Sequence, residues 1–134
     1  MSIINASELL SLAIKARESS YCPYSGISVG AALMTKSGRI YFGANIENAS
    51  YSPTICAERV AFFKAISEGE REFIAIAIAG GEKDKESKAD FPPCGVCRQV
   101  MSEFCDGDFR VIWGNHEKMT DTPLKEILPY SFKL

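Results

Sequence analysis

The longest uninterrupted apolar run in the chain, Phe73–Ala79, restricts the fold more than any other feature of the sequence. The run is far too short to span a bilayer, which takes roughly 20 apolar residues. A strand with one solvated face would alternate apolar and polar residues, whereas a continuous run is typical of a strand covered on both faces. We therefore expect a buried strand inside a layered α/β domain.

The rest of the pattern predicts helices and strands that alternate along the chain. Helices are expected at Ala6–Ser19, Thr54–Glu68 and Gly95–Cys105. Strands are expected at Ile27–Thr35, Arg39–Ala44, Phe109–Trp113 and near Met119, with a terminal turn around Leu124–Leu128. The segment Gly80–Asp90 mixes both signs of charge and is expected to be a solvated loop within one domain, residues 1–134.

The net charge and the N-terminal sequence indicate where the protein is located and which kinds of partner it can bind. The net charge of −2 argues against a protein that grips nucleic acid through its phosphates. The first ten residues, MSIINASELL, lack the basic and long apolar regions of a secretory signal. We therefore expect a cytoplasmic protein with no membrane partner, in which clustered cysteines indicate metal binding or catalysis.

Three of the five cysteines form a pattern at the starts of two predicted helices. Cys56 opens the string CAER, and Cys94 and Cys97 lie in the string PPCGVCR. Residues three apart share one face of a helix, so the sulfurs of Cys94 and Cys97 should point the same way. Helix N-termini stabilise thiolates, which are the form of cysteine that binds zinc.

Three sulfurs leave one position of a tetrahedral zinc shell open. His116 lies in a polar turn and is expected to be exposed, although it could in principle close the shell. Cys22 and Cys105 are expected to be small buried hydrophobic residues. Because a structural zinc site is usually closed by four protein ligands, an open position favours a catalytic site with water in it.

Glu58 follows the first cysteine by two residues and could make such a site catalytic. A carboxylate beside zinc-activated water can accept a proton and deliver it to a substrate nitrogen. The alternative is a glutamate that only complements the helix dipole. This cysteine and glutamate arrangement is a known signature of zinc deaminases. Arg59 and Arg98 follow the cysteines closely and could donate to their sulfurs, the alternative being surface ion pairs.

With these motifs in view, the sequence resembles the cytidine deaminases of the small homotetrameric class. The resemblance covers nearly the whole chain and rests on the strings PYS (23–25), VGAAL (29–33), GANIENA (43–49), CAER (56–59), PCGVCRQ (93–99) and LPYSF (128–132). It implies a three-layer α/β/α sandwich around a mixed central sheet of about five strands. It also implies one zinc ion per subunit on Cys56, Cys94 and Cys97, with Glu58 as the proton shuttle.

The same resemblance implies a nucleoside substrate. Residues matching Asn45 and Glu47 hold the sugar hydroxyls in that family, and backbone around Ala57 orients the base. An amide and a carboxylate two residues apart at a strand end point the same way, which suits a sugar hydroxyl. The expected reaction is the hydrolytic deamination of cytidine and 2′-deoxycytidine, with water as the second substrate and ammonia released, in pyrimidine salvage.

Three further positions bear on the binding site. Ile27 stands where the family usually has an aromatic residue that stacks on the base, so that aliphatic contact would replace stacking. Phe132 and residues near Tyr51 reach a neighbouring subunit's site in the family, which implies a homotetramer with shared active sites. The alternative is that Phe132 packs on the core of its own subunit.

Other functions remain open from sequence. The nearest is a related deaminase of aminopyrimidine nucleosides such as blasticidin S. A polynucleotide editor is disfavoured because the chain offers no basic aromatic surface to hold a strand. A non-catalytic binding module, in which the three cysteines only staple the fold through zinc, would need a fourth protein ligand such as His116.

Overall fold

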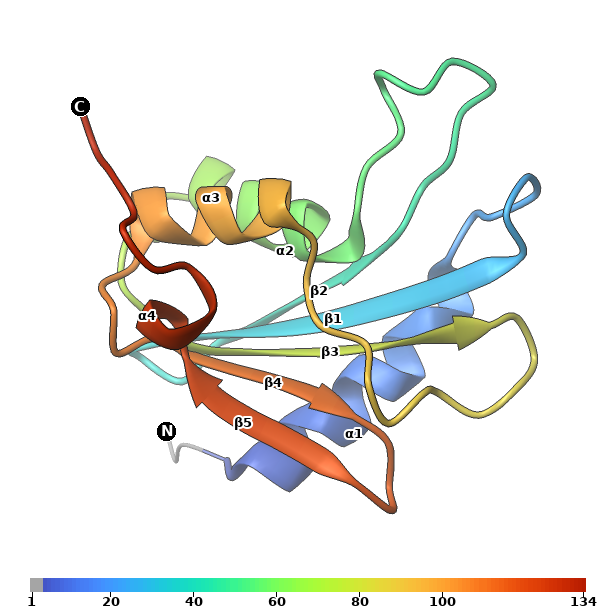
Figure 1. Cartoon of the computed structure of the whole chain (residues 1–134), viewed down its shortest axis with the longest axis horizontal. Coiled ribbons are helices and arrows are strands. Elements are labelled where there is room, and N and C mark those ends of the chain that lie inside the picture. The colour runs from blue at the N-terminus through green and yellow to red at the C-terminus, as the bar shows by residue number, and fades with distance from the viewer. Residues whose placement is uncertain (1–3) are drawn as a thin grey trace.

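The central element is a five-stranded sheet with the order β2-β1-β3-β4-β5 (Figure 1). The computed structural model describes residues 4–134. The strands are β1 (Ile27–Thr35), β2 (Ile40–Ala44), β3 (Phe73–Glu82), β4 (Arg110–Gly114) and β5 (Met119–Pro123). β3 and β4 run parallel, and the other neighbouring pairs run antiparallel. The sheet is therefore mixed, as expected.

Helices cover both faces of this sheet. α1 (Ala6–Ala16), followed by a 3₁₀ turn at Arg17–Ser19, lies on one face. The opposite face carries α2 (Ala57–Ser67), α3 (Gly95–Phe104) and the short α4 (Leu124–Ile127), as Figure 1 shows. Two separate clusters of buried side chains fill the two interfaces. The predicted three-layer α/β/α sandwich is confirmed. Among residues 4–134, no helix combines the length and the apolar character needed to cross a membrane.

The strand β3 explains why the sheet needs cover on both sides. Ile76 and Ile78 point into the core beneath α2 and α3, whereas Ala75, Ala77 and Ala79 point toward α1. Successive side chains of a strand point to opposite faces of the sheet. In a strand without polar residues both faces are therefore apolar, and exposing either one to water would cost free energy. The small alanines on one face let α1 pack close to the sheet.

Gly43 of β2 sets the position of the helix that begins at the cysteine motif. A Cβ atom at Gly43 would lie 2.1 Å from the carbonyl oxygen of Ala57, in the first turn of α2. The backbones of β2 and α2 therefore touch directly, which no larger residue permits. This contact fixes the start of α2, and with it Cys56 and Glu58, against the sheet edge.

Several predicted boundaries differ from the structure, and those of α2 and β3 each differ by three residues at one end. α2 begins at Ala57 rather than Thr54, because Cys56 is its N-cap and has extended backbone angles. β3 continues to Glu82 rather than ending at Ala79, since its pairing with β1 extends to Ile27. The following polar segment is not solvated throughout, because Ser87 is buried and donates a 3.0 Å hydrogen bond to the carbonyl of Gly114.

Candidate functional site

Three cysteine sulfurs converge where the N-termini of α2 and α3 meet. Cys56 caps α2, Cys94 caps α3, and Cys97 lies in the first turn of α3. The three Sγ atoms lie within 4.8 Å of one another, and those of Cys56 and Cys94 are 3.8 Å apart. Three sulfurs at this spacing, on helix ends that favour thiolates, form a donor set that fits a zinc ion.

The cluster favours a thiolate at Cys56. The pKa of Cys56 is lowered to about 5, first by a hydrogen bond from Cys97 and further by the neighbouring Arg59. Nη2 of Arg59 lies 3.4 Å from the Cys56 Sγ. Within residues 4–134, the buried Nε of Arg59 has no hydrogen-bond partner. Arg59 therefore brings positive charge to the sulfurs, in the place where the sequence predicts it.

Arg98 takes a different place from the one expected. Its Nε donates to the carbonyl oxygen of Pro93 at 2.8 Å, and its Nη1 donates to that of Ile127 at 2.8 Å. The expectation that it donates to a sulfur is corrected by these contacts. Arg98 instead ties the residue before Cys94 to the end of α4, so that its role at the cluster is indirect.

Glu58 lies in the first turn of α2 and is almost completely buried, with 4% of its surface exposed. Burial, together with the nearby charge of Cys56, raises the pKa of Glu58 to about 7. A carboxyl group with such a pKa can both accept and release a proton near neutral pH, which is the property that general acid–base catalysis needs.

Asn45 and Glu47 lie beyond the end of β2, and most of their hydrogen-bonding capacity is used within the protein. Oδ1 of Asn45 accepts from the amide of Val29 at 2.8 Å and from the hydroxyl of Ser20 at 2.6 Å. Its Nδ2 donates to the carbonyl of Ile27 at 2.8 Å. One amide hydrogen of Asn45 remains for a ligand.

Glu47 faces a small recess beside the turn that precedes β1. Oε1 of Glu47 accepts from the amides of Tyr24 at 2.9 Å and Ser25 at 3.1 Å, and Oε2 accepts from the hydroxyl of Ser25. Hydrogen bonding, first from that hydroxyl, lowers the pKa of Glu47. The recess measures about 320 Å³, and Tyr51 also lines it.

The remaining predicted residues are spread over several surroundings. Ile27 packs against the core beneath α2 and α3, and Ala57 is fully buried. Tyr51 is 91% exposed, and Phe132, in the C-terminal tail, is 65% exposed. The structure thus brings Tyr51 to the recess of Glu47, whereas the side chain of Phe132 is largely exposed and does not pack on the core of this chain.

The other candidate metal ligands lie outside the cluster. Among residues 4–134, the group that could hold a metal ion consists of Cys56, Cys94 and Cys97. Cys22 and Cys105 are buried elsewhere, and His116 is exposed in the turn between β4 and β5. The three-cysteine arrangement that the sequence suggests is therefore also the arrangement that the fold assembles.

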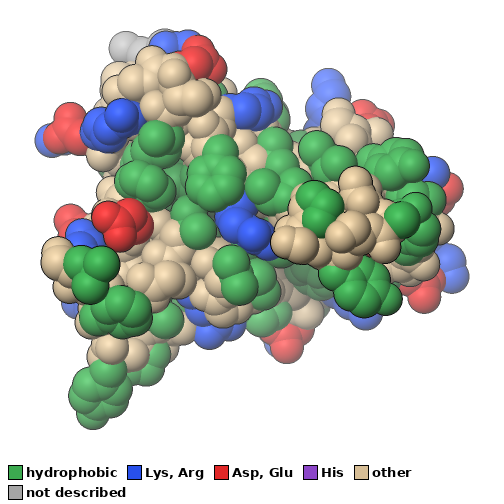
Figure 2. All heavy atoms as spheres, turned by 90° about the horizontal axis from the view of Figure 1, so that it is seen from above, with side chains coloured by type: hydrophobic (Ala, Val, Ile, Leu, Met, Phe, Trp, Pro, Cys, Tyr) green, Lys and Arg blue, Asp and Glu red, His purple; other side chains and the backbone are tan. Residues whose placement is uncertain are grey.

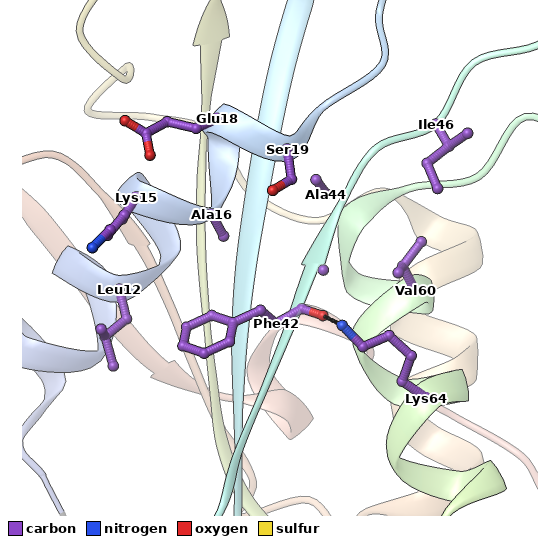
Figure 3. Close-up of a pocket in the computed structure, with 11 residues that line it drawn as sticks. Leu12, Lys15, Ala16, Glu18, Ser19, Phe42, Ala44, Ile46, Val60 and Lys64 are labelled. Atoms are coloured by element: carbon purple, nitrogen blue, oxygen red, sulfur yellow. Dashed lines mark hydrogen bonds between the residues drawn. The ribbon is translucent and has the colours of Figure 1, made fainter.

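One sizeable hollow lies away from these residues. It measures about 500 Å³ and runs along the edge strand β2 between α1 and α2. Figure 3 shows Phe42 between Leu12 of α1 and Lys64 of α2, with the Lys64 ammonium donating to the Phe42 carbonyl. None of the cysteines lines it, so size alone does not identify the reactive site.

Sequence reasoning missed two serines that hold predicted site residues. Ser20 donates to Asn45, and Ser25 donates to Glu47. Ser25 belongs to the string PYS, which carried part of the resemblance without a role assigned to it. A hydroxyl that donates to a residue more than 20 positions away in sequence produces no periodic pattern. These hydrogen bonds are therefore visible only in the folded chain.

Comparison with known proteins agrees with this geometry. Residues 4–114 match the family described as the cytidine and deoxycytidylate deaminase zinc-binding region. A cytidine deaminase from Halalkalibacterium halodurans is 50% identical, covering 92% of this chain and 91% of that protein. The crystal structure of cytidine deaminase from Burkholderia pseudomallei superimposes with a TM-score of 0.85 at 40% identity, covering 96% of this chain and 100% of that one. A more distant relative, the blasticidin-S deaminase of Bacillus cereus, is 32% identical over 78% of this chain and 76% of that protein.

Proposed function

The chain belongs to the cytidine and deoxycytidylate deaminase family, and from this premise we propose that it hydrolyses cytidine and 2′-deoxycytidine to uridine and 2′-deoxyuridine. Residues 1–134 would act as one deaminase domain. Each turnover consumes one water and releases one ammonia. The observation that carries the proposal is the buried carboxyl of Glu58 beside three converging cysteine sulfurs.

The three cysteines would hold one zinc ion per subunit. When bound, zinc lowers the pKa of water toward about 7 and so supplies a nucleophile at neutral pH. Three thiolates around a divalent cation leave a net negative shell, which makes a weaker electrophile. Arg59 offsets part of this charge by donating to Cys56, as the 3.4 Å contact supports.

Glu58 would move the protons of the reaction. It takes one from the attacking water and passes it to N3 of the base, which makes C4 more electrophilic. It then assists the departure of the C4 amino group as ammonia. Its burial supports this role, because a carboxyl with a raised pKa both accepts and returns a proton near neutral pH.

Substrate recognition would use residues other than the three cysteines and Glu58. Backbone around Ala57 orients the base, with Ile27 in aliphatic contact with it. The carboxylate of Glu47 and the remaining amide hydrogen of Asn45 would hold sugar hydroxyls. The recess shared by Glu47 and Tyr51 supports this assignment.

A substrate panel tests the proposed function. Purified protein with one zinc per subunit should release ammonia from cytidine and 2′-deoxycytidine, and much more slowly from free cytosine, which lacks the sugar. Blasticidin S belongs in the panel because a blasticidin-S deaminase is among the relatives. Preferential ammonia release from blasticidin S would reverse the assignment, and no release from any of the four compounds would contradict deaminase activity.

We also propose a homotetramer in which each active site draws on neighbouring subunits. Hydrophobic side chains gather on the face that α2 and α3 form, seen from above in Figure 2. Exposed large apolar residues on these helices and on the C-terminal tail are Phe63, Val96, Tyr130, Phe132 and Leu134. Such side chains support burial against another subunit.

Light scattering and complementation test this assembly. The mass in solution should be about four times 14.7 kDa. Phe132→Ala should lower activity about tenfold or more, as truncation of an aromatic anchor does. Co-expression of Phe132→Ala with inactive Glu58→Gln should restore activity if Phe132 completes a neighbour's site. A monomeric mass, or no recovery in the mixed assembly, would contradict shared sites.

We further propose that the reaction serves pyrimidine salvage in the cytoplasm. All five cysteines are free in the structure. Free cysteines, three of them clustered as metal ligands would be, suit a reducing compartment.

A further inference from the structure

The hydroxyl of Ser25 lies between the carboxylate of Glu47 and the backbone at the start of β1. It donates to Oε2 of Glu47 and accepts from the amide of Ile27 at 3.0 Å. A serine hydroxyl has a single proton to donate and lone pairs to accept with. Because the Ile27 amide occupies a lone pair, it sets the rotation of the hydroxyl and directs the proton toward Glu47.

The turn itself holds Ser25 in this position. Gly26 has a φ of +70°, a conformation that glycine adopts at little cost. Its amide donates to the carbonyl of Cys22 at 3.1 Å, and its own carbonyl accepts from the amide of Lys83 at 2.8 Å. The segment is therefore anchored to the end of β3, and Ser25 projects from a fixed backbone.

Glu47 has one acceptor position left for a ligand. A carboxylate offers about four lone-pair sites. Three of them are used, by the amides of Tyr24 and Ser25 on Oε1 and by the Ser25 hydroxyl on Oε2. The hydroxyl of Ser25 thus fixes the plane of the carboxylate, so that the remaining lone pair of Oε2 points in one direction.

We propose that Ser25 is the positioning residue that makes this site select substrates carrying sugar hydroxyls. This inference rests on the proposed nucleoside deaminase function and on Glu47 as the acceptor of a sugar hydroxyl. Without the Ser25 hydroxyl the carboxylate of Glu47 can rotate. Substrates that donate a hydrogen bond to this carboxylate should then bind more weakly. The hydroxyls concerned are those at C2′ and C3′ of the sugar, so a substrate that lacks both of them loses nothing.

The test compares Ser25→Ala with Ser25→Thr, which keeps the hydroxyl. For Ser25→Ala, KM for cytidine should rise roughly tenfold, the order expected for a hydrogen bond to a charged group. kcat should stay within about twofold. KM for 2′,3′-dideoxycytidine should not change, and Ser25→Thr should keep a KM for cytidine near that of the unmodified protein. Ser37→Ala, in the turn between β1 and β2, is the matched serine control.

A second measurement separates this inference from the proposed reaction. Calorimetric binding of uridine and 2′,3′-dideoxyuridine needs no turnover, and Ser25→Ala should weaken only the first. If the unmodified protein does not deaminate cytidine, the proposed reaction is wrong. The binding constants for uridine and 2′,3′-dideoxyuridine would still decide the role of Ser25. Equal weakening of both ligands, or an unchanged uridine affinity, would overturn it. Zinc content should be the same in every variant.

Discussion

Glu58→Gln is expected to abolish measurable deamination of cytidine while the protein keeps one zinc ion per subunit. Glutamine has nearly the same shape, so it fills the buried space without a cavity, but it cannot carry a proton between water and base. Loss of a general acid–base group lowers rates by about 10²- to 10⁴-fold. A group that serves several proton transfers belongs at the upper end of that range. Ammonia release and metal analysis on the same sample measure both quantities.

The far end of the same helix offers a matched control for this variant. Glu68 caps the other end of α2, is exposed, and pairs with Arg39 at 3.8 Å on the surface. Glu68→Gln removes the same charge from the same helix and should leave kcat/KM within about twofold, because surface ion pairs contribute little. Loss of zinc from Glu58→Gln would show that Glu58 is structural, and retained turnover would show that it carries no essential proton.

Cys97→Ala is expected to remove zinc and activity together. Cys97 is the most deeply buried of the three cysteines, and two sulfurs do not make up a stable zinc site. Metal binding adds to the stability of the fold that forms the site, so the thermal unfolding midpoint should fall as well. Metal analysis, ammonia release from cytidine and a thermal melt provide the three readouts.

Cys105→Ala and His116→Ala serve as controls for this loss. Cys105 is a buried cysteine outside the cluster. Cys105→Ala therefore measures how far loss of a buried thiol lowers the unfolding midpoint when no metal ligand is removed. His116→Ala should leave zinc content unchanged, because the histidine is exposed in the β4–β5 turn. Release of zinc by His116→Ala would instead favour a closed structural site, and zinc retained by Cys97→Ala would rule out Cys97 as a ligand.

The two arginines show where prediction from sequence works and where it fails. Arg59 lies three residues after Cys56 on the same helix, so helical spacing alone places its guanidinium near the sulfur, and the contact is present. Arg98 lies four residues after Cys94, a spacing that also shares a helix face, yet its donors go to the carbonyls of Pro93 and Ile127. The second of these comes from α4, which no local pattern connects with α3.

Asn45 gives the same lesson in the predicted binding residues. Its position after β2 follows from the strand pattern, and its amide can serve a sugar hydroxyl. The structure shows that the amide also joins β1 and Ser20, the residue after the 3₁₀ turn, to the end of β2 through three hydrogen bonds. The hydrogen-bond partners lie 16 to 25 residues away in sequence. The amino-acid sequence alone therefore does not reveal that Asn45 also holds these segments together.

The sequence by itself determined the layered fold and indicated the three cysteines that the fold brings together, because both depend on local spacing. An apolar run that needs cover on both faces predicts a buried strand, and cysteines at helix starts predict thiolates that can bind metal. Only the tertiary structure decided how these residues meet. Cys56 and Cys94 are 38 residues apart, and the direct contact between Gly43 and α2 helps to hold one of them in place. The raised pKa of Glu58 and the fixed carboxylate of Glu47 depend on burial and on hydrogen-bond partners from distant segments, which only packing brings together.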